Sequence, residues 1–164
     1  IREQLPESIE IAQIDEKLSA LGNVISCNDK IALVHPEIEQ ETIDIIQDVL
    51  QVEPVIPSLI GTESLVGSYS IFTNKGGVVS PNCTKEQIDE LSNFLGISIS
   101  SATVNKGSNL VGAGICVNDD ILICGWETTA FEIGTLTRVF KITETSTPED
   151  GMFEVDETLK DLLI

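Results

Sequence analysis

A unit of 45 residues recurs three times along this 164-residue chain, and this period constrains the fold more than any other feature of the sequence. Three glycines, Gly22, Gly67 and Gly112, mark the period. The same spacing relates six apolar triplets: Ile14, Leu59 and Val104; Ile43, Ile88 and Ile133; Ile46, Leu91 and Leu136; Val49, Phe94 and Val139; Leu50, Leu95 and Phe140; and Val52, Ile97 and Ile142. Such a period is typical of stacked supersecondary units, because one unit cannot bury its apolar face alone.

Each unit is predicted to begin with a β-hairpin, because two short apolar runs flank a polar tip. The three tips are residues 28–30, 74–77 and 118–120. They are rich in Asn, Asp and Gly, which tolerate the positive φ angles that tight hairpin turns require.

The apolar spacing after each hairpin becomes helical. The expected helical face of the first unit consists of Ile43, Ile46, Val49 and Leu50. In the second unit, Thr84 followed by Gln87 predicts a capping box. Closing strands are expected around residues 52–55 and 97–100. The predicted class is therefore α+β, with the order hairpin, helix, strand in each unit.

The chain begins at an unexpected point of the period, because Ile1 and Leu5 fall 45 residues before Ile46 and Leu50. We therefore expect an N-terminally truncated chain, in which residues 9–14 supply the closing strand of an incomplete unit; a diverged first unit is the alternative. The expected division is a remnant of a preceding unit (1–20), three repeat units (21–65, 66–110 and 111–142) and an acidic C-terminal tail (143–164).

The formal net charge is −18, from 27 acidic and 9 basic residues. A broad basic surface for nucleic acid is therefore not expected. The acidity favours basic protein partners, although acidic faces that only keep a domain soluble are an equally good explanation. No apolar run approaches the roughly 20 residues that a membrane-spanning helix needs, so no membrane partner is expected.

A catalytic interpretation would have to use His35, the only histidine, together with one of four cysteines. These are Cys27, Cys83, Cys116 and Cys124, and their spacing matches no metal site. The positions that correspond to His35 in the next units are Ser80 and Gly125, so the fold does not need an imidazole there. We expect a surface histidine, mostly core cysteines, no metal and no cofactor; a disulfide framework is the alternative for the cysteines.

Lysines and asparagines gather in the predicted turns. Lys30 and Lys75 occupy similar hairpin tips, which would share one rim of the molecule and are candidate RNA contacts, although lysine is common in any exposed turn. The junctions between units contain Asn23 and the run Asn105 to Ser108. In the tail, Ser146 and Thr147 each have an acidic residue three positions later and are candidate phosphorylation sites.

Several strings strongly resemble the translation initiation factor 6 family, the ribosome anti-association factors of eukaryotes and archaea. They are Leu18-Ser19-Ala20-Leu21-Gly22-Asn23-Val24, Cys27-Asn28-Asp29, Ala32-Leu33-Val34-His35-Pro36, Val66-Gly67-Ser68-Tyr69, Thr103-Val104-Asn105-Lys106-Gly107-Ser108 and Val117-Asn118-Asp119. The resemblance covers residues 1 to about 142 and implies a pentein, or α/β-propeller, fold. Five units would form a closed ring of about 225 residues, so about 80 N-terminal residues are expected to be missing.

The resemblance implies a steric function without catalysis. Members of the family bind the large (60S) ribosomal subunit near the sarcin–ricin loop and its neighbouring ribosomal proteins, and so block the small subunit. They accompany maturing large subunits from the nucleus, including the nucleolus, to the cytoplasm, where a GTPase and its cofactor protein release them. The candidate ribosome contacts are Asn23, Asn105, Lys106, Gly107 and Ser108. The alternatives are a pentein-type guanidino-modifying enzyme that uses His35 and a cysteine, and an interaction scaffold unrelated to the ribosome.

Overall fold

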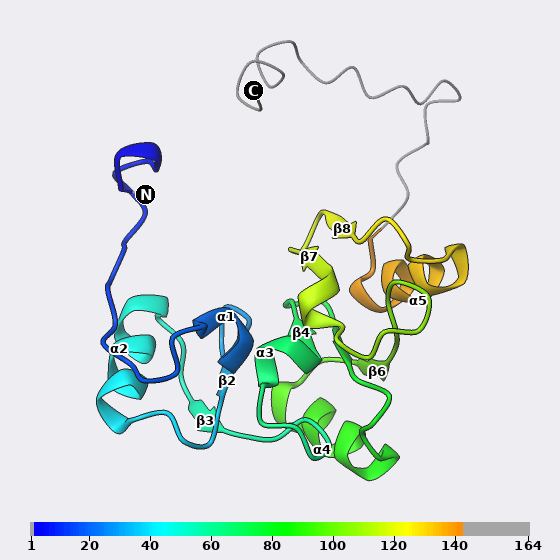
Figure 1. Ribbon diagram of the computed structural model, residues 1–164, viewed down its shortest axis with the longest axis horizontal. Coiled ribbons are helices and arrows are strands. Elements are labelled where there is room, and N and C mark those ends of the chain that lie inside the picture. Colours follow the sequence, from blue (N-terminus) through cyan, green and yellow to red (C-terminus); the bar gives the residue numbers. More distant parts are fainter. Residues whose placement is uncertain (1, 143–164) are drawn as a thin grey trace.

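The computed structural model describes residues 2–142 of the chain. The chain forms three successive groups of short strands and helices that follow one another along an arc (Figure 1). The first group contains α1 (Leu21–Val24), β1 (Ile25–Cys27), β2 (Ala32–Val34), α2 (Gln40–Leu50) and β3 (Val55–Pro57). The second contains α3 (Val66–Tyr69), β4 (Ser70–Phe72), β5 (Gly77–Val79), α4 (Lys85–Leu95) and β6 (Ile99–Ser101). The third contains the 3-10 helix η2 (Gly112–Gly114), β7 (Ile115–Val117), β8 (Leu122–Cys124) and α5 (Ala130–Phe140).

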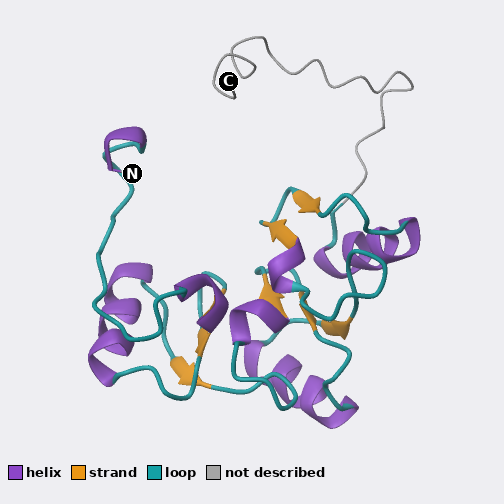
Figure 2. Ribbon diagram, in the orientation of Figure 1, coloured by secondary structure: helices purple, strands orange, loops and turns teal. Residues whose placement is uncertain are grey.

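The sheets are small and share one topology. β1 pairs antiparallel with β2, and β3 joins β2 in parallel. The second sheet repeats this arrangement, with β4 antiparallel to β5 and β6 parallel to β5. β7 and β8 form an antiparallel pair, and no third strand lies beside them within residues 2–142. Residues 2–142 thus form a mixed α/β structure with short strands and five α-helices (Figure 2).

The three longer helices, α2, α4 and α5, have 11 residues each and lie on the outer side of the arc (Figure 1). The predicted capping box of Thr84 and Gln87 is confirmed at the start of α4. A second capping box, formed by Thr129 and Glu132, begins α5. Such caps satisfy backbone N–H groups that have no partner inside the helix. None of the described helices is long and apolar enough to cross a membrane.

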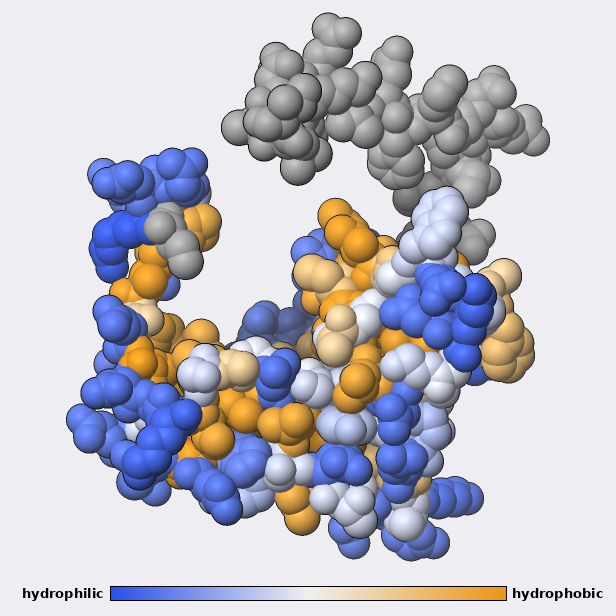
Figure 3. All heavy atoms as spheres, in the orientation of Figure 1, coloured by the Kyte–Doolittle hydropathy of each residue, from blue (hydrophilic) through white to orange (hydrophobic). Residues whose placement is uncertain are grey.

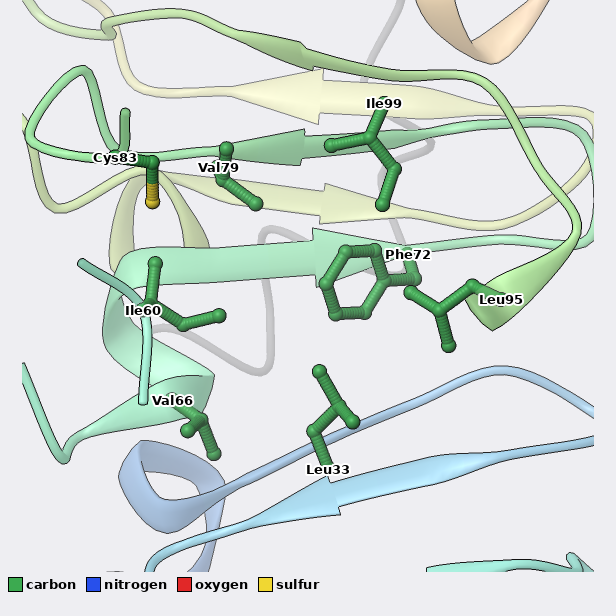
Figure 4. Close-up of a cluster of buried hydrophobic side chains, with 8 residues drawn as sticks. All are labelled: Leu33, Ile60, Val66, Phe72, Val79, Cys83, Leu95 and Ile99. Atoms are coloured by element: carbon green, nitrogen blue, oxygen red, sulfur yellow. The ribbon is translucent and has the colours of Figure 1, made fainter. Parts of the chain in front are cut away.

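Neighbouring groups share their hydrophobic cores. Leu33 of β2 belongs to a buried cluster that the second group otherwise builds, and it points toward Phe72 and Leu95 (Figure 4). One period later, Val78 of β5 is buried with Phe140 of α5. The sheet of one group therefore packs against the helix of the next group, and neither group could bury these side chains alone.

The two ends of the arc leave their corresponding residues uncovered. Ile123 of β8 occupies the position of Leu33 and Val78, yet it is 63% exposed. Leu50, the counterpart of Leu95 and Phe140, is 45% exposed at the other end. Figure 3 shows hydrophobic atoms at the surface over β7 and β8.

Backbone stacking joins the groups along the inner side of the arc. A Cβ atom at Gly67 of α3 would overlap the carbonyl oxygen of Gly22 in α1. A Cβ atom at Gly112 of η2 would overlap the carbonyl oxygen of Gly67 in the same way. The recurring glycines therefore serve close backbone approach, which no other residue permits at these two positions.

Several sequence predictions need correction. The closing strands lie at β3 and β6, a few residues later than predicted, and residues 9–14 contain no strand. The short helices before each hairpin were not predicted, because four residues are too few to show a helical period. Leu59, which the period pairs with the fully buried Val104, is 49% exposed, and the adjacent Ile60 is buried in its place.

Candidate functional site

The candidate contacts Asn105, Lys106, Gly107 and Ser108 lie in one tight turn between β6 and η2, which we name the contact turn. Val104 and Ser108 close it by exchanging two backbone hydrogen bonds, of 3.0 and 2.7 Å. The three residues between them have φ angles of 48°, 61° and 101°. Two of these residues are not glycine, so their left-handed conformation is uncommon and requires support from their surroundings.

Much of that support comes from Glu132 in the first turn of α5, whose side chain is 7% exposed. Its Oε1 accepts hydrogen bonds from the Thr103 hydroxyl at 2.7 Å and from the Gly107 N–H at 2.9 Å. Its Oε2 accepts from the Lys106 N–H at 3.3 Å and from the N–H and hydroxyl of Thr129, both at 2.8 Å. One carboxylate thus connects the contact turn to the cap of α5.

The charge state of Glu132 follows from these contacts. Burial disfavours the ionised form, but the hydrogen bonds from Thr129, Thr103 and Gly107 outweigh it and lower the pKa of Glu132 to about 2. The carboxylate is therefore ionised at neutral pH, where it can accept hydrogen bonds at both oxygens.

The side chains of the contact turn point to different environments. The side-chain oxygen of Asn105 accepts from the Thr128 hydroxyl at 3.2 Å, and the backbone N–H of Asn105 donates to the same hydroxyl at 3.2 Å. Gly125 leaves room for this amide, because a Cβ atom there would overlap it. Lys106 instead extends outward and pairs with Glu127 at 2.8 Å, both side chains being more than 60% exposed. The accessible cation of the turn is therefore Lys106.

Asn23 lies apart from the contact turn. It is exposed in α1, and its N–H donates to the carbonyl of Ala20 at 2.9 Å. Its backbone lies against Gly67 of α3, whereas Asn105 lies against Gly114 of η2. The structure brings four of the five candidate contacts together in one turn, and places Asn23 in α1 of the first group.

The hairpin tips meet one another, but their surroundings are acidic. The Asn74 amide donates to Asp29 at 2.7 Å and to Asp119 at 2.9 Å, and so links all three groups. This amide is the main reason why the pKa of Asp119 is lowered. Lys75 donates to the Asp119 carbonyl and lies 3.6 Å from the Asp120 carboxylate.

A pocket of about 450 Å³ lies among these tips, and it is lined by their asparagines and aspartates and by apolar residues such as Leu50 and Phe72. The candidate RNA contact Lys75 is thus engaged with its own protein, whereas Lys30 is exposed. An RNA contact at these lysines stays a prediction. Among residues 2–142, no group of His, Cys, Asp and Glu side chains is arranged to hold a metal ion.

His35 is 8% exposed, so the expected surface position was wrong. Its Nδ1 accepts the N–H of Glu37 at 3.0 Å, just as the hydroxyl of the corresponding residue Ser80 accepts the N–H of Asn82 at 3.2 Å. The imidazole thus fills the place of a turn-forming hydroxyl.

The cysteines give no support to a Cys–His nucleophile. Within the described part of the chain all four are free thiols, and none hydrogen-bonds His35. Burial raises the pKa of the Cys27 and Cys83 thiols, which keeps them protonated at neutral pH. Cys116 is exposed and is not a core residue. The candidate phosphorylation sites Ser146 and Thr147 lie outside the described residues.

Sequence reasoning missed Glu132, although a signal for it was present. Thr129 and Glu132 have the same spacing as Thr84 and Gln87 and identify a capping box. The contacts of Glu132 with the contact turn had no such signal, because they join residues 25 and more positions apart.

Comparisons with known proteins agree with the sequence resemblance. A sequence model described as the eIF-6 family matches residues 1–139. The chain is 45% identical to eukaryotic translation initiation factor 6 of Babesia bovis over 166 residues, which cover 100% of this chain and 65% of the relative. The relative from Toxoplasma gondii is 44% identical over 164 residues, or 100% of this chain and 61% of its own length. That from Drosophila melanogaster is 46% identical over 144 residues, or 88% and 58%. The chain thus spans about three fifths of the length of these relatives.

Proposed function

The chain belongs to the eIF-6 family, and from that premise we propose that it binds the large (60S) ribosomal subunit and sterically prevents premature joining of the small subunit. The observation that carries the proposal is the family match over residues 1–139, together with relatives about 45% identical that are named as translation initiation factors. A translation initiation factor role follows directly from that membership. The steric mechanism is our inference.

We propose that the three groups are part of a pentein ring of five such units. Two features support this. The sheet of each group packs on the helix of the next, and the glycine contacts repeat with the same period. The exposed Ile123 and Leu50 are the residues that further units would cover at the two ends of the arc. Because the ring would be closed by residues outside this chain, isolated arcs are expected to be less stable than the closed ring.

The contact turn and Asn23 form the proposed ribosome-binding surface. Lys106 is the accessible cation there, and its ammonium suits a minor contact with an rRNA phosphate near the sarcin–ricin loop. The net charge of −18 suits the basic ribosomal proteins around that loop. A protein seated on the face of the large subunit that meets the small subunit blocks joining by occupying space, and needs no catalytic group.

The remaining partners follow from the same cycle. A bound anti-association factor has to leave before the small subunit joins, so a release GTPase and its cofactor protein are proposed partners. Large subunits are assembled in the nucleus, including the nucleolus, and function in the cytoplasm. We propose that the protein occurs in both compartments, and cell fractionation with an antibody against this chain would test this.

Co-sedimentation with purified large subunits in a sucrose gradient tests the proposed function. The wild-type chain is expected to migrate with large subunits, whereas Asn23→Glu and Lys106→Glu are expected to remain largely at the top. Lys17→Glu is a matched control for Lys106→Glu, because Lys17 also forms an exposed ion pair, with Glu39 at 2.6 Å, but lies outside the proposed surface. A wild-type chain that does not migrate with large subunits at physiological salt would refute the proposal.

A further inference from the structure

The contact turn is shaped by a residue that does not belong to it. Two of its amides, those of Lys106 and Gly107, point away from solvent and donate to Glu132. We propose that Glu132 is a positioning residue for large-subunit binding, which fixes the left-handed conformation of residues 105–107 and hence the direction in which Lys106 leaves the surface. This inference rests on the proposed function and deepens it.

Capping of α5 does not by itself require a carboxylate. In α4 the neutral Gln87 performs the same task, because its amide oxygen accepts the Thr84 N–H at 2.9 Å. The Gln87 amide nitrogen then donates to the carbonyl of Gly61 at 3.3 Å, in the junction that corresponds to the contact turn. The two junctions therefore present opposite groups to the same helix position, a carbonyl to Gln87 and amides to Glu132.

Only a carboxylate satisfies all the backbone donors that meet at Glu132. The N–H groups of Lys106 and Thr129 point to Oε2, and the N–H of Gly107 points to Oε1. A glutamine amide has one oxygen and one NH2 group, so either orientation directs the NH2 group at one or more backbone N–H donors. Replacement of Glu132 by Gln therefore leaves a donor without an acceptor, which is a costly arrangement in a buried site.

The consequence for binding is a loss of preorganisation. Asn105 and Lys106 have φ angles of 48° and 61°, a region that residues with a Cβ atom leave readily when nothing holds them there. A turn that samples other conformations must be ordered again when it binds, and this lowers affinity without removing any contact side chain. Lys106 and Ser108 would remain in the chain and still bind less tightly.

The test compares two single variants, Glu132→Gln and Gln87→Glu. The two substitutions exchange a carboxylate and an amide at corresponding positions of α5 and α4. Large-subunit binding is measured by co-sedimentation, and backbone order is measured as hydrogen exchange of the Gly107 amide. We expect Glu132→Gln to bind about tenfold more weakly, the equivalent of one charge-assisted hydrogen bond, and to exchange Gly107 faster. Gln87→Glu is expected to bind within about twofold of wild type, because its junction lacks the contact turn.

The outcomes separate this inference from the function on which it rests. Wild type that fails to bind overturns the proposed function, and with it the role in binding. Wild type and Glu132→Gln that bind equally overturn only the positioning role. Weaker binding with unchanged Gly107 exchange also overturns the positioning role, since Glu132 would then act in another way.

If Glu132→Gln does not fold, Thr103→Val removes one donor to Oε1 and keeps the carboxylate. Its Gly107 exchange should rise and its binding should fall by a smaller factor, and unchanged values would refute the proposal.

Discussion

The two junctions between groups share one backbone pairing but differ in the length of the turn that it closes. The first junction, residues 59–65, contains the fully buried Ile60, which pairs with Glu63 through two backbone hydrogen bonds of 2.9 and 3.1 Å. The second junction, residues 103–110, contains the fully buried Val104, which pairs with Ser108 in the same manner. Two residues lie between the paired residues in the first junction and three in the second. A single additional residue therefore distinguishes the two.

With that additional residue, the second junction offers backbone donors to the following helix, whereas the first offers a backbone acceptor. In the first, only Gly61 has a positive φ angle, 66°, and its carbonyl accepts from Gln87. In the second, three left-handed residues follow one another, and Glu132 at the start of α5 accepts the backbone N–H groups of two of them, Lys106 and Gly107. The comparison shows how a repeated scaffold can acquire a special surface: one insertion changes the turn, and one Gln-to-Glu difference stabilises it.

The backbone contacts between neighbouring groups, which repeat just after each junction, are expected to give the largest effect. Gly67→Ala and Gly112→Ala should each lower the free energy of unfolding by about 3 kcal/mol, because the new Cβ atom overlaps a backbone carbonyl that cannot move aside. The measurement is urea unfolding followed by circular dichroism. Gly22→Ala is the matched control, because no atom lies within 4 Å of a Cβ atom at that position.

The loss of stability should be similar at Gly67 and Gly112. A large loss at Gly67 with a negligible loss at Gly112 would show that only the contact between the first and second groups depends on close backbone approach. A loss at Gly22 equal to the other two would show that the effect reflects alanine itself rather than contact between groups.

Much of the fold could be predicted from the period and the local pattern. Hairpins followed from the polar tips, and helices from apolar spacing such as that of Ile88, Leu91 and Leu95. The sequence could not show that Ile60 rather than Leu59 is the buried residue. Both residues are apolar, and a one-residue insertion leaves the rest of the period intact. The short helices α1 and α3 could not be predicted for a different reason, since one helical turn carries no periodic signal.

The candidate site was predictable only in part. The resemblance identified the residues of the contact turn, but its three left-handed φ angles depend on a partner that lies 25 or more residues later in the chain. The burial of His35 could not be predicted from the period, because its counterparts Ser80 and Gly125 are not apolar, and only the structure shows that Ser80 is fully buried.

A smaller effect, with a characteristic pH dependence, is expected at Glu132. Glu132→Gln should lower the free energy of unfolding by about 2 kcal/mol at neutral pH, since it leaves a buried donor without an acceptor. The folded-state pKa of about 2 lies below the ordinary value of 4.5, so the ionised form favours the folded state. This contribution is complete above pH 4.5 and is lost as the pH falls toward about 2.

The difference in stability between wild type and Glu132→Gln should therefore narrow over that interval, measured by urea unfolding at several pH values. Gln87→Ala provides the comparison at the first junction. Its difference from wild type should stay constant with pH, because Gln87 does not titrate. A difference at Glu132 that is equally independent of pH would show that its charge does not stabilise the contact turn.

The smallest expected effect concerns Glu127, the partner of Lys106. Glu127→Gln removes an exposed ion pair and should change stability by less than about 0.5 kcal/mol. It also frees the Lys106 ammonium, so large-subunit binding should tighten by about two- to threefold at low salt and return to the wild-type value at about 0.5 M salt.

Glu63→Gln at the first junction is the control, because it raises the net charge of −18 by the same single unit without freeing a lysine of the contact turn. If both variants tighten binding equally, the gain comes from overall charge. If only Glu127→Gln does so, Lys106 meets a negative group on the ribosome, and the second junction differs from the first in function as well as in shape.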